Sequence, residues 1–492
     1  MMKRTDYERF EMLAAKGGII PIFQELPADM ETPVSVLERF AGDENVCLME
    51  SVENSEKFGR YSFLGVNPKG MFTVVDGNPY IVFSGQRLKL KFDKFPLDAL
   101  RPLLSSRAIV HDPLLPPLPG GAIGYCSYEA AGMFEKLPAP KPGDNTPLCA
   151  FMLTDEIIAF DNMHHTMMVI VNVHLDNFSS KRAAFEAGEK ELGALVRRIE
   201  TPVISHISIP HEEKVALKPE MTRESFEAMV EKAKQYITEG EIIQVVPSQS
   251  FTATTSIPPF LMYRALRLVN PSPYMFFLKL GDETLVGSSP ETLVKLENGH
   301  SNVRPIAGTR KRGTTPADDR RLMDDLLHDE KECAEHLMLV DLARNDVGRT
   351  AVNGSVQVKS FMTVEKYSHV MHIVSDVEGI LDRNYDAIDL LATTFPAGTL
   401  SGAPKIRAME IINELEPRPR GVYGGCVGYI SYDGNMDMAI TIRTIEARSG
   451  KVRIQAGAGI VYDSVPSNEY QETINKAAAL FQSVEFAGRN LK

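Results

Sequence analysis

The sequence predicts an α+β fold in which layered antiparallel sheets form a β-sandwich core flanked by helices. The C-terminal half mixes strand and helix patterns without the strict alternation that is typical of parallel sheets. Short strand-turn-strand units, such as ENG at 297–299 and RSGK at 448–451, indicate antiparallel hairpins. With 492 residues, of which 43% are hydrophobic, the chain can bury a large core.

The individual elements follow from local patterns. Residues 181–200 have the pattern of an amphipathic helix, and a second helix starts after Thr222, a good N-cap, and ends at Gly240. Two further helices are expected over 319–343 and from about 466 to 483, where Pro466 suits the first helical position. Strands are expected at five places: 284–287, 292–296, 370–378, 438–446 and 451–456.

The clearest boundary lies at 201–220, which contains three prolines and little helical pattern. It predicts an N-terminal domain over 1–200, a linker over 201–220 and a catalytic domain over 221–492. The loose stretch at 112–118 is interpreted as a loop within the first domain.

Composition narrows the class of protein. A net charge of −12 and a pI near 5.5 argue against nucleic acid or an anionic membrane as a partner, because both need a basic surface. The five cysteines are odd in number and form no C-x-x-C motif, which favours a reducing compartment. No uncharged apolar run approaches the roughly 18 residues of a membrane span. We therefore expect a cytoplasmic protein.

Two carboxylate pairs are candidate metal ligands. Glu332 and Glu335 are three residues apart, as are Glu469 and Glu472, with Lys476 on the same stripe as the second pair. If the two helices meet, the four carboxylates repel one another, and Mg²⁺ is the usual cation that relieves this. The alternative is two solvated helix faces, which is the commoner explanation for any single such pair.

Other motifs are less specific. FPAGTLSGAPK (395–405) and QAGAG (455–459) are glycine-rich but fit neither the phosphate-loop nor the dinucleotide spacing. Their backbone N–H groups could approach an anion, or they could simply be tight turns. Arg443, in an apolar alternating strand, needs an acidic partner or a bound anion. His372 could be functional or structural.

Taken together, the C-terminal segments resemble the chorismate-utilising enzymes. The matching strings appear in the family's order across nearly the whole C-terminal half. They are GEIIQVVPSQSF (240–251), SSPETLVK (288–295), PIAGTRKRG (305–313), DEKECAEHLMLVDLARNDVGR (329–349), FPAGTLSGAPK (395–405), GVYGGCVGYI (421–430), AITIRT (439–444) and IQAGAGIVYDSVPSNEYQETINKA (454–477).

The resemblance implies roles for individual residues. It implies that Glu335 and Glu472 bind Mg²⁺, with Glu332 and Glu469 as supporting ligands. Glu291 and His372 fall at positions treated in the family as proton-transfer candidates. The implied residues of the chorismate pocket are Gly308, Thr309, Thr399, Tyr423, Arg443, Gly457, Gly459 and Lys476.

Two positions separate the reactions of the family. Members that add water carry lysine where this chain has Gln244, and aminodeoxychorismate synthases carry a nucleophilic lysine where this chain has Ala307. The resemblance therefore implies that ammonia attacks chorismate and that pyruvate is then eliminated, leaving anthranilate. Aminodeoxychorismate formation is the alternative within the family, and an inactive tryptophan sensor is the alternative outside catalysis.

The resemblance also implies regulation and a partner. LMES (48–51) and NPSPYMFF (270–277) are similar to the tryptophan-binding strings of feedback-inhibited members. The implied lining of that regulatory pocket is Glu50, Ser51, Pro273, Tyr274, Met275, Val427 and Tyr429. Cys426 matches only a bare G-x-C-x-G pattern and is interpreted as structural. A separate glutaminase subunit is thus expected to supply ammonia from glutamine.

Overall fold

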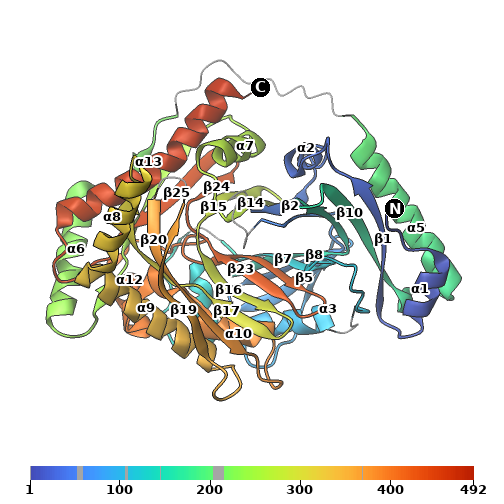
Figure 1. Cartoon of the computed structure of the whole chain (residues 1–492), viewed down its shortest axis with the longest axis horizontal. Coiled ribbons are helices and arrows are strands. Elements are labelled where there is room, and N and C mark those ends of the chain that lie inside the picture. The colour runs from blue at the N-terminus through green and yellow to red at the C-terminus, as the bar shows by residue number, and fades with distance from the viewer. Residues whose placement is uncertain are drawn as a thin grey trace.

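Two large antiparallel sheets packed face to face form the centre of the molecule (Figure 1). The structure is a computed structural model that describes residues 2–51, 59–105, 109–143, 146–202, 215–367 and 370–491. The predicted α+β class with layered antiparallel sheets is confirmed.

The first sheet has eleven strands among the residues described. In spatial order they are β1 (Ile19–Pro27), β10 (Thr166–His174), β9 (Glu156–Asp161), β3 (Tyr61–Val66), β2 (Asn45–Glu50), β14 (Tyr274–Leu280), β15 (Glu283–Ser289), β24 (Thr444–Arg448), β25 (Lys451–Gly457), β13 (Ser248–Thr254) and β11 (Lys218–Pro219).

The second sheet has twelve strands within the same described ranges. Along its path lie β18 (Ile306–Lys311), β20 (Val370–Ile380), β17 (His300–Val303), β16 (Thr292–Glu297), β23 (Met436–Ile440), β22 (Cys426–Ser431), β7 (Gly121–Cys126), β8 (Cys149–Thr154), β4 (Gly70–Val75), β5 (Asn78–Phe83) and β6 (Gln86–Lys89), with β19 (Gln357–Lys366) paired to β20. A separate small ladder joins β12 (Gln244–Val245) to β21 (Gly402–Ala403).

Both sheets contain strands from either side of the 201–220 segment. In the first sheet β2 pairs with β14, and in the second β7 pairs with β22. Most of the predicted linker, 203–214, lies outside the described residues. The division into two domains stays a prediction, but the two halves share continuous sheets.

Helices cover the outer faces of the sandwich (Figure 1). The longer ones are α1 (Tyr7–Ala14), α5 (Lys181–Glu200), α6 (Arg223–Thr238), α7 (Pro259–Val269), α8 (Pro316–Leu327), α9 (Glu330–Gly348), α10 (Ala387–Thr394), α12 (Lys405–Leu415) and α13 (Pro466–Asn490). The short ones are α2 (Pro33–Glu38), α3 (Arg101–Ser105), α4 (Ala131–Phe134) and α11 (Gly398–Ser401), with 3₁₀ turns η1 (Pro96–Leu100), η2 (Tyr128–Ala130) and η3 (Leu175–Asn177). Within the described ranges, no helix is both long and apolar enough to cross a membrane.

Three main clusters of buried side chains hold these layers together. Between the sheets, Phe276 of β14 packs in one cluster with Tyr125 of β7. The outer face of the first sheet packs against α1, α5, α7 and α13, whereas α6, α10 and α12 contribute to the core of the second sheet. Burial of these apolar faces is the main driving force for the layered arrangement.

The structure corrects two predicted elements. The single strand expected over 438–446 is wrong, because the chain leaves the second sheet after β23 and enters the first at β24, with Arg443 between them at a φ of 49°. The single helix expected over 319–343 is also wrong. It is divided into α8 and α9 at Asp329, whose side chain caps the second helix.

Candidate active site

The first carboxylate pair lies in the opening turns of α9. Glu335 Oε1 accepts a hydrogen bond from Gln244 Nε2 at 2.9 Å, which joins α9 to β12. Glu332 lies beside Arg310, with 3.5 Å between Oε1 and Nη1. Burial raises the pKa of Glu332, and the Glu335 charge adds to this effect. The pair therefore faces β12 and β18, and is not a fully solvated helix face.

The second pair lies in the opening turns of α13. Glu472 Oε1 forms an ion pair with Lys476 Nζ at 2.7 Å, and the same Nζ donates to the Gly457 carbonyl at 2.9 Å. Burial raises the pKa of Glu469, and the Glu472 charge also acts in that direction. The positive charge of Lys331, at the start of α9, acts on Glu469 in the opposite direction. The opening turns of the two helices thus influence each other electrostatically.

The loop after β25 needs glycine for reasons of space. A Cβ on Gly457 would lie 2.9 Å from the Tyr423 hydroxyl, and one on Gly459 would lie 2.8 Å from Gln244 Nε2. Both distances are shorter than side chains tolerate without a shift of the neighbour. The glycines let the backbone approach Tyr423 and Gln244 closely, and their expected role in binding an anion stays a prediction.

Glu291 is the most strongly perturbed carboxyl of the predicted set. Burial raises its pKa to about 7, while a hydrogen bond from Thr399 Oγ1 at 3.0 Å and the charge of Arg443 act in the opposite direction. Glu291 and Thr399 line a small cavity of about 40 Å³. A carboxyl with this pKa can hold or release a proton near neutral pH.

His372 lies on β20, opposite a bulge in β18. Its Nδ1 is 2.9 Å from the Gly308 carbonyl and 3.1 Å from Thr309 Oγ1, and Gly308 has a φ of 67° that favours glycine. Burial lowers the pKa of His372, and Arg443 lowers it further. Because a carbonyl only accepts, Nδ1 carries the proton of the neutral ring and Nε2 keeps a lone pair.

The contacts connect most of the predicted site residues. The positive charge of Arg443 acts to lower the pKa of both Glu291 and His372. A Cβ added to Gly308 would lie 3.2 Å from Glu332 Oε2, so Gly308 lies beside the first carboxylate pair. Through Gln244, the α9 pair also adjoins Gly459.

The four candidate metal ligands lie as two pairs, and only in this sense do they match the expected binding of a divalent cation. Among the residues described, no group of three or more Asp, Glu, His or Cys is gathered closely enough to hold a metal. Within each pair, however, one carboxylate raises the pKa of the other. Oxygen ligands of this kind suit Mg²⁺, although Lys476 and Arg310 already offset part of the repulsion within the pairs.

The seven predicted regulatory residues lie on both sides of the first sheet, and two of them, Val427 and Tyr429, belong to β22 of the second sheet. Met275 lies opposite Glu50 in the β2–β14 ladder, and Glu50 accepts hydrogen bonds from Tyr263 and Arg267 of α7. The other face turns toward the second sheet, where three of the seven lie in the inter-sheet cluster: Tyr274, Val427 and Tyr429.

The remaining two regulatory residues lie at the ends of these strands. Pro273 is buried directly before β14, and Ser51 directly follows β2. The Ser51 hydroxyl is buried and has no hydrogen-bond partner within the described part of the chain. Residues 52–58, which follow it, lie outside that part.

Sequence reasoning missed a buried ion pair behind Tyr423. Arg420 is 1% exposed and lies 2.6 Å from Glu416, with its guanidinium over the rings of Tyr128 and Tyr423. A buried charge needs such a partner. The only local signal, EPRPRG at 416–421, has the pattern of a proline-rich turn.

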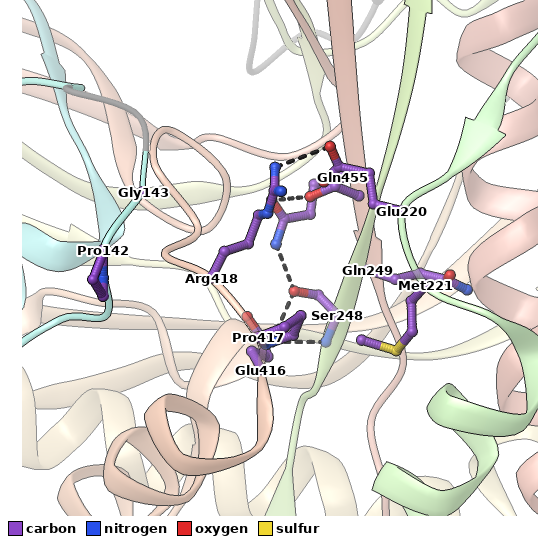
Figure 2. Close-up of a pocket in the computed structure, with 11 residues that line it drawn as sticks. Pro142, Gly143, Glu220, Met221, Ser248, Gln249, Glu416, Pro417, Arg418 and Gln455 are labelled. Atoms are coloured by element: carbon purple, nitrogen blue, oxygen red, sulfur yellow. Dashed lines mark hydrogen bonds and ion pairs between the residues drawn. The ribbon is translucent and has the colours of Figure 1, made fainter.

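Glu416 of this ion pair lines a polar cavity of about 250 Å³ (Figure 2). Gln455 donates to Ser248, which donates to Glu416, and Arg418 pairs with Glu220 at 2.9 Å. In the described ranges, none of the predicted site residues lines this cavity.

Comparisons with known proteins agree with this architecture. A family described as chorismate binding enzyme matches residues 46–482. The anthranilate synthase component 1 of Acetivibrio thermocellus is 44% identical over 492 residues, covering 98% of this chain and 98% of its own length. That of Aquifex aeolicus (strain VF5) is 44% identical over 485 residues, covering 98% of this chain and 97% of its own.

Solved structures of other proteins are also similar to this chain. Anthranilate synthase component I from Streptococcus pneumoniae TIGR4 is similar with a TM-score of 0.78 and 39% identity, covering 92% of this chain and 98% of that one. The menaquinone-specific isochorismate synthase of Escherichia coli, 19% identical with a TM-score of 0.72 over 96% of this chain and 98% of its own, shares the fold. The chain therefore belongs to the chorismate-binding enzymes and, within them, to the anthranilate synthase component 1 group.

Proposed function

We propose that the protein converts chorismate and ammonia to anthranilate, pyruvate and water, the entry step of tryptophan synthesis. The observation that carries this proposal is its 44% identity, over almost the full length, to proteins named anthranilate synthase component 1. The proposal includes a cytoplasmic location, a lyase-type reaction and dependence on Mg²⁺.

Charged and backbone groups bind the two carboxylates of chorismate in this proposal. Arg443 and Lys476 supply positive charge, while Gly457 and Gly459 supply N–H groups that no Cβ shields. Tyr423 adds a hydroxyl beside Gly457. Gly308 and Thr309 line the side of the site that holds His372.

Glu335 and Glu472 would hold Mg²⁺ directly, with Glu332 and Glu469 in support. When bound, the ion neutralises the ring carboxylate of the substrate and stabilises charge that develops during elimination. Gln244 donates to Glu335 and so orients that carboxylate.

His372 and Glu291 move protons in opposite senses. The lowered pKa of His372 keeps its ring neutral, so Nε2 can accept a proton as pyruvate is lost. Glu291, with a pKa of about 7, can be protonated in the resting site and can donate to a departing oxygen. Thr399 orients Glu291 by donating a hydrogen bond to it.

The choice of ammonia as nucleophile rests on two side chains. Gln244 has no amine with which to activate water, and Ala307 has none with which to attack the ring. Aminodeoxychorismate synthesis is therefore the less favoured function.

Ammonia comes from a partner glutaminase subunit in this proposal. Among the described cysteines, Cys426 is fully buried beside Cys126, and burial raises its pKa well above the ordinary range. A buried neutral thiol is a poor nucleophile for glutamine hydrolysis. Tryptophan is proposed as a feedback inhibitor that binds at Ser51 and Met275, away from the chorismate site.

The experiment is direct. Purified protein with chorismate, Mg²⁺ and ammonium should produce the fluorescence of anthranilate, and omission of either Mg²⁺ or ammonium should abolish it. Gln244→Lys should lower anthranilate formation by roughly 10- to 100-fold, because it removes an orienting partner of Glu335. A matched surface change, Gln471→Lys, should not. Full activity of Gln244→Lys would show that this position does not serve the reaction.

A further inference from the structure

The hydroxyl of Tyr274 joins β14 of the first sheet to two strands of the second. It lies 2.9 Å from Thr292 Oγ1 on β16 and donates to Asp437 Oδ1 on β23 at 3.0 Å. A carboxylate can only accept, so the single tyrosine proton goes to Asp437 and the Thr292 hydroxyl donates to the tyrosine oxygen. The three polar groups form one buried chain between the sheets.

Thr292 directly follows the catalytic candidate Glu291. Thr292 begins β16 and Glu291 immediately precedes it, so the position of Thr292 constrains the backbone of Glu291 through one peptide bond. The Glu291 carbonyl accepts from the Ile440 N–H at 3.0 Å, and its carboxylate accepts from Thr399. A displacement of Thr292 therefore also displaces Glu291, whose carboxyl group is held by these hydrogen bonds.

Tyr274 also belongs to the predicted tryptophan pocket. Its neighbour Met275 pairs with Glu50 in the ladder that joins β14 to β2, and Ser51 follows directly. A ligand seated against Ser51 and Met275 contacts the same short strand segment that carries the tyrosine hydroxyl. Tyr274 of that segment is hydrogen-bonded to Thr292, the residue that follows Glu291.

We propose that Tyr274 is a positioning residue for Glu291, and that its hydrogen bond to Thr292 couples occupancy of the tryptophan pocket to the chorismate site. This inference rests on the proposed inhibition by tryptophan. When tryptophan displaces the start of β14, the bond to Thr292 lengthens and Glu291 leaves the orientation that chorismate needs. By linkage, chorismate weakens tryptophan binding by the same factor.

The test compares two conservative variants, Tyr274→Phe and Thr292→Val, which remove the two hydroxyls while keeping the side-chain bulk. Thr73→Val, the same change on β4 of the same sheet, is the control. The measured quantity is the coupling factor, the ratio of chorismate KM with saturating tryptophan to chorismate KM without it. Because the sequence contains no Trp, tryptophan binding is followed in the same samples by the fluorescence of the ligand.

Both variants should lower the coupling factor by roughly 2- to 10-fold, the equivalent of one neutral hydrogen bond. The double variant should lower it no further than Tyr274→Phe, which already removes the bond to Thr292 together with the bond to Asp437. Thr292→Val should still bind tryptophan, and Thr73→Val should keep the full coupling factor. A purely structural role would lower thermal stability and leave the ratio unchanged.

The possible outcomes are distinct. If tryptophan inhibits the wild type and both variants to the same extent, the coupling role of Tyr274 is wrong and feedback inhibition stands. Additive effects in the double variant, or an equal loss in Thr73→Val, also overturn the role. If tryptophan neither binds nor inhibits the wild type, the proposed regulation itself fails and the coupling fails with it.

Discussion

The proposed catalytic and regulatory regions differ in what surrounds their residues. In the proposed catalytic region, burial raises the pKa of Glu291 to about 7 and lowers the pKa of His372. In the regulatory region Tyr274, Val427 and Tyr429 pack in an apolar core between the sheets. We therefore expect substitutions in the first region to alter proton transfer and cation binding, and substitutions in the second to alter the packing between the sheets.

The two regions also differ in their position along the chain. All the predicted catalytic residues follow residue 243, whereas the regulatory set includes Glu50 and Ser51 from the first half. Glu50 and Met275 of the proposed regulatory set face each other in the β2–β14 ladder, one of the places where the two halves pair. We therefore expect changes at Glu335, Glu472 or His372 to act on catalysis and a change at Ser51 to act on inhibition.

The largest expected effect belongs to the carboxylates. Glu335→Ala and Glu472→Ala should each abolish anthranilate formation, a loss well beyond the roughly 10- to 100-fold that removal of an outer-shell partner costs. Thermal unfolding should change little, because both side chains are partly solvated. Near-native turnover of either variant at saturating Mg²⁺ would show that the pair does not hold the ion.

A smaller effect is expected at His372. His372→Met should slow pyruvate loss by about 10²- to 10⁴-fold, the usual contribution of a proton-transfer group, and should slow amine addition less. An aminated intermediate should then accumulate and be visible by chromatography. Equal slowing of both steps would remove this specific role.

The regulatory region should respond without loss of catalysis. Ser51→Ala should weaken tryptophan inhibition by roughly 10- to 150-fold, the value of a hydrogen bond to a charged group. Activity without tryptophan should be nearly unchanged. If Ser51→Ala retains wild-type inhibition, the regulatory pocket is assigned to the wrong residues.

The smallest expected effect concerns stability and pH at Glu291. Burial raises the pKa of Glu291 from 4.5 to about 7. Between these two pH values the folded protein keeps a proton on this carboxyl, whereas the unfolded chain has released it. The stability that this contributes is complete below the unfolded value and is lost as pH rises through the folded value. Relative to Glu291→Gln, the wild type should lose about 1–3 kcal/mol between about pH 4 and pH 8. Denaturant unfolding at the two pH values measures this, and a constant difference between the two proteins would contradict it.

The sequence predicted local structure better than long-range geometry. The Thr222 cap and the two hairpins are local patterns, and the structure confirms them. The strand over 438–446 was mispredicted because its alternating pattern continues through Arg443, where the chain crosses between sheets.

Long-range contacts were also not predicted within the candidate active site. Spacing placed Glu332 and Glu335 on one helix face, but the partner of Glu335 is Gln244, 91 residues away along the chain. The bond between Tyr274 and Thr292 joins different sheets and has no local signature. Such contacts depend on how the two sheets stack, which no single segment specifies.

The central claim is that this chain itself adds ammonia to chorismate and then releases pyruvate. The most direct measurement incubates the purified chain with chorismate, Mg²⁺ and ¹⁵N-labelled ammonium, and follows the products by mass spectrometry. We expect ¹⁵N-labelled anthranilate and pyruvate in equal amounts, with Glu335→Ala as the inactive control. Isochorismate, or an aminated product without pyruvate, would contradict the claim.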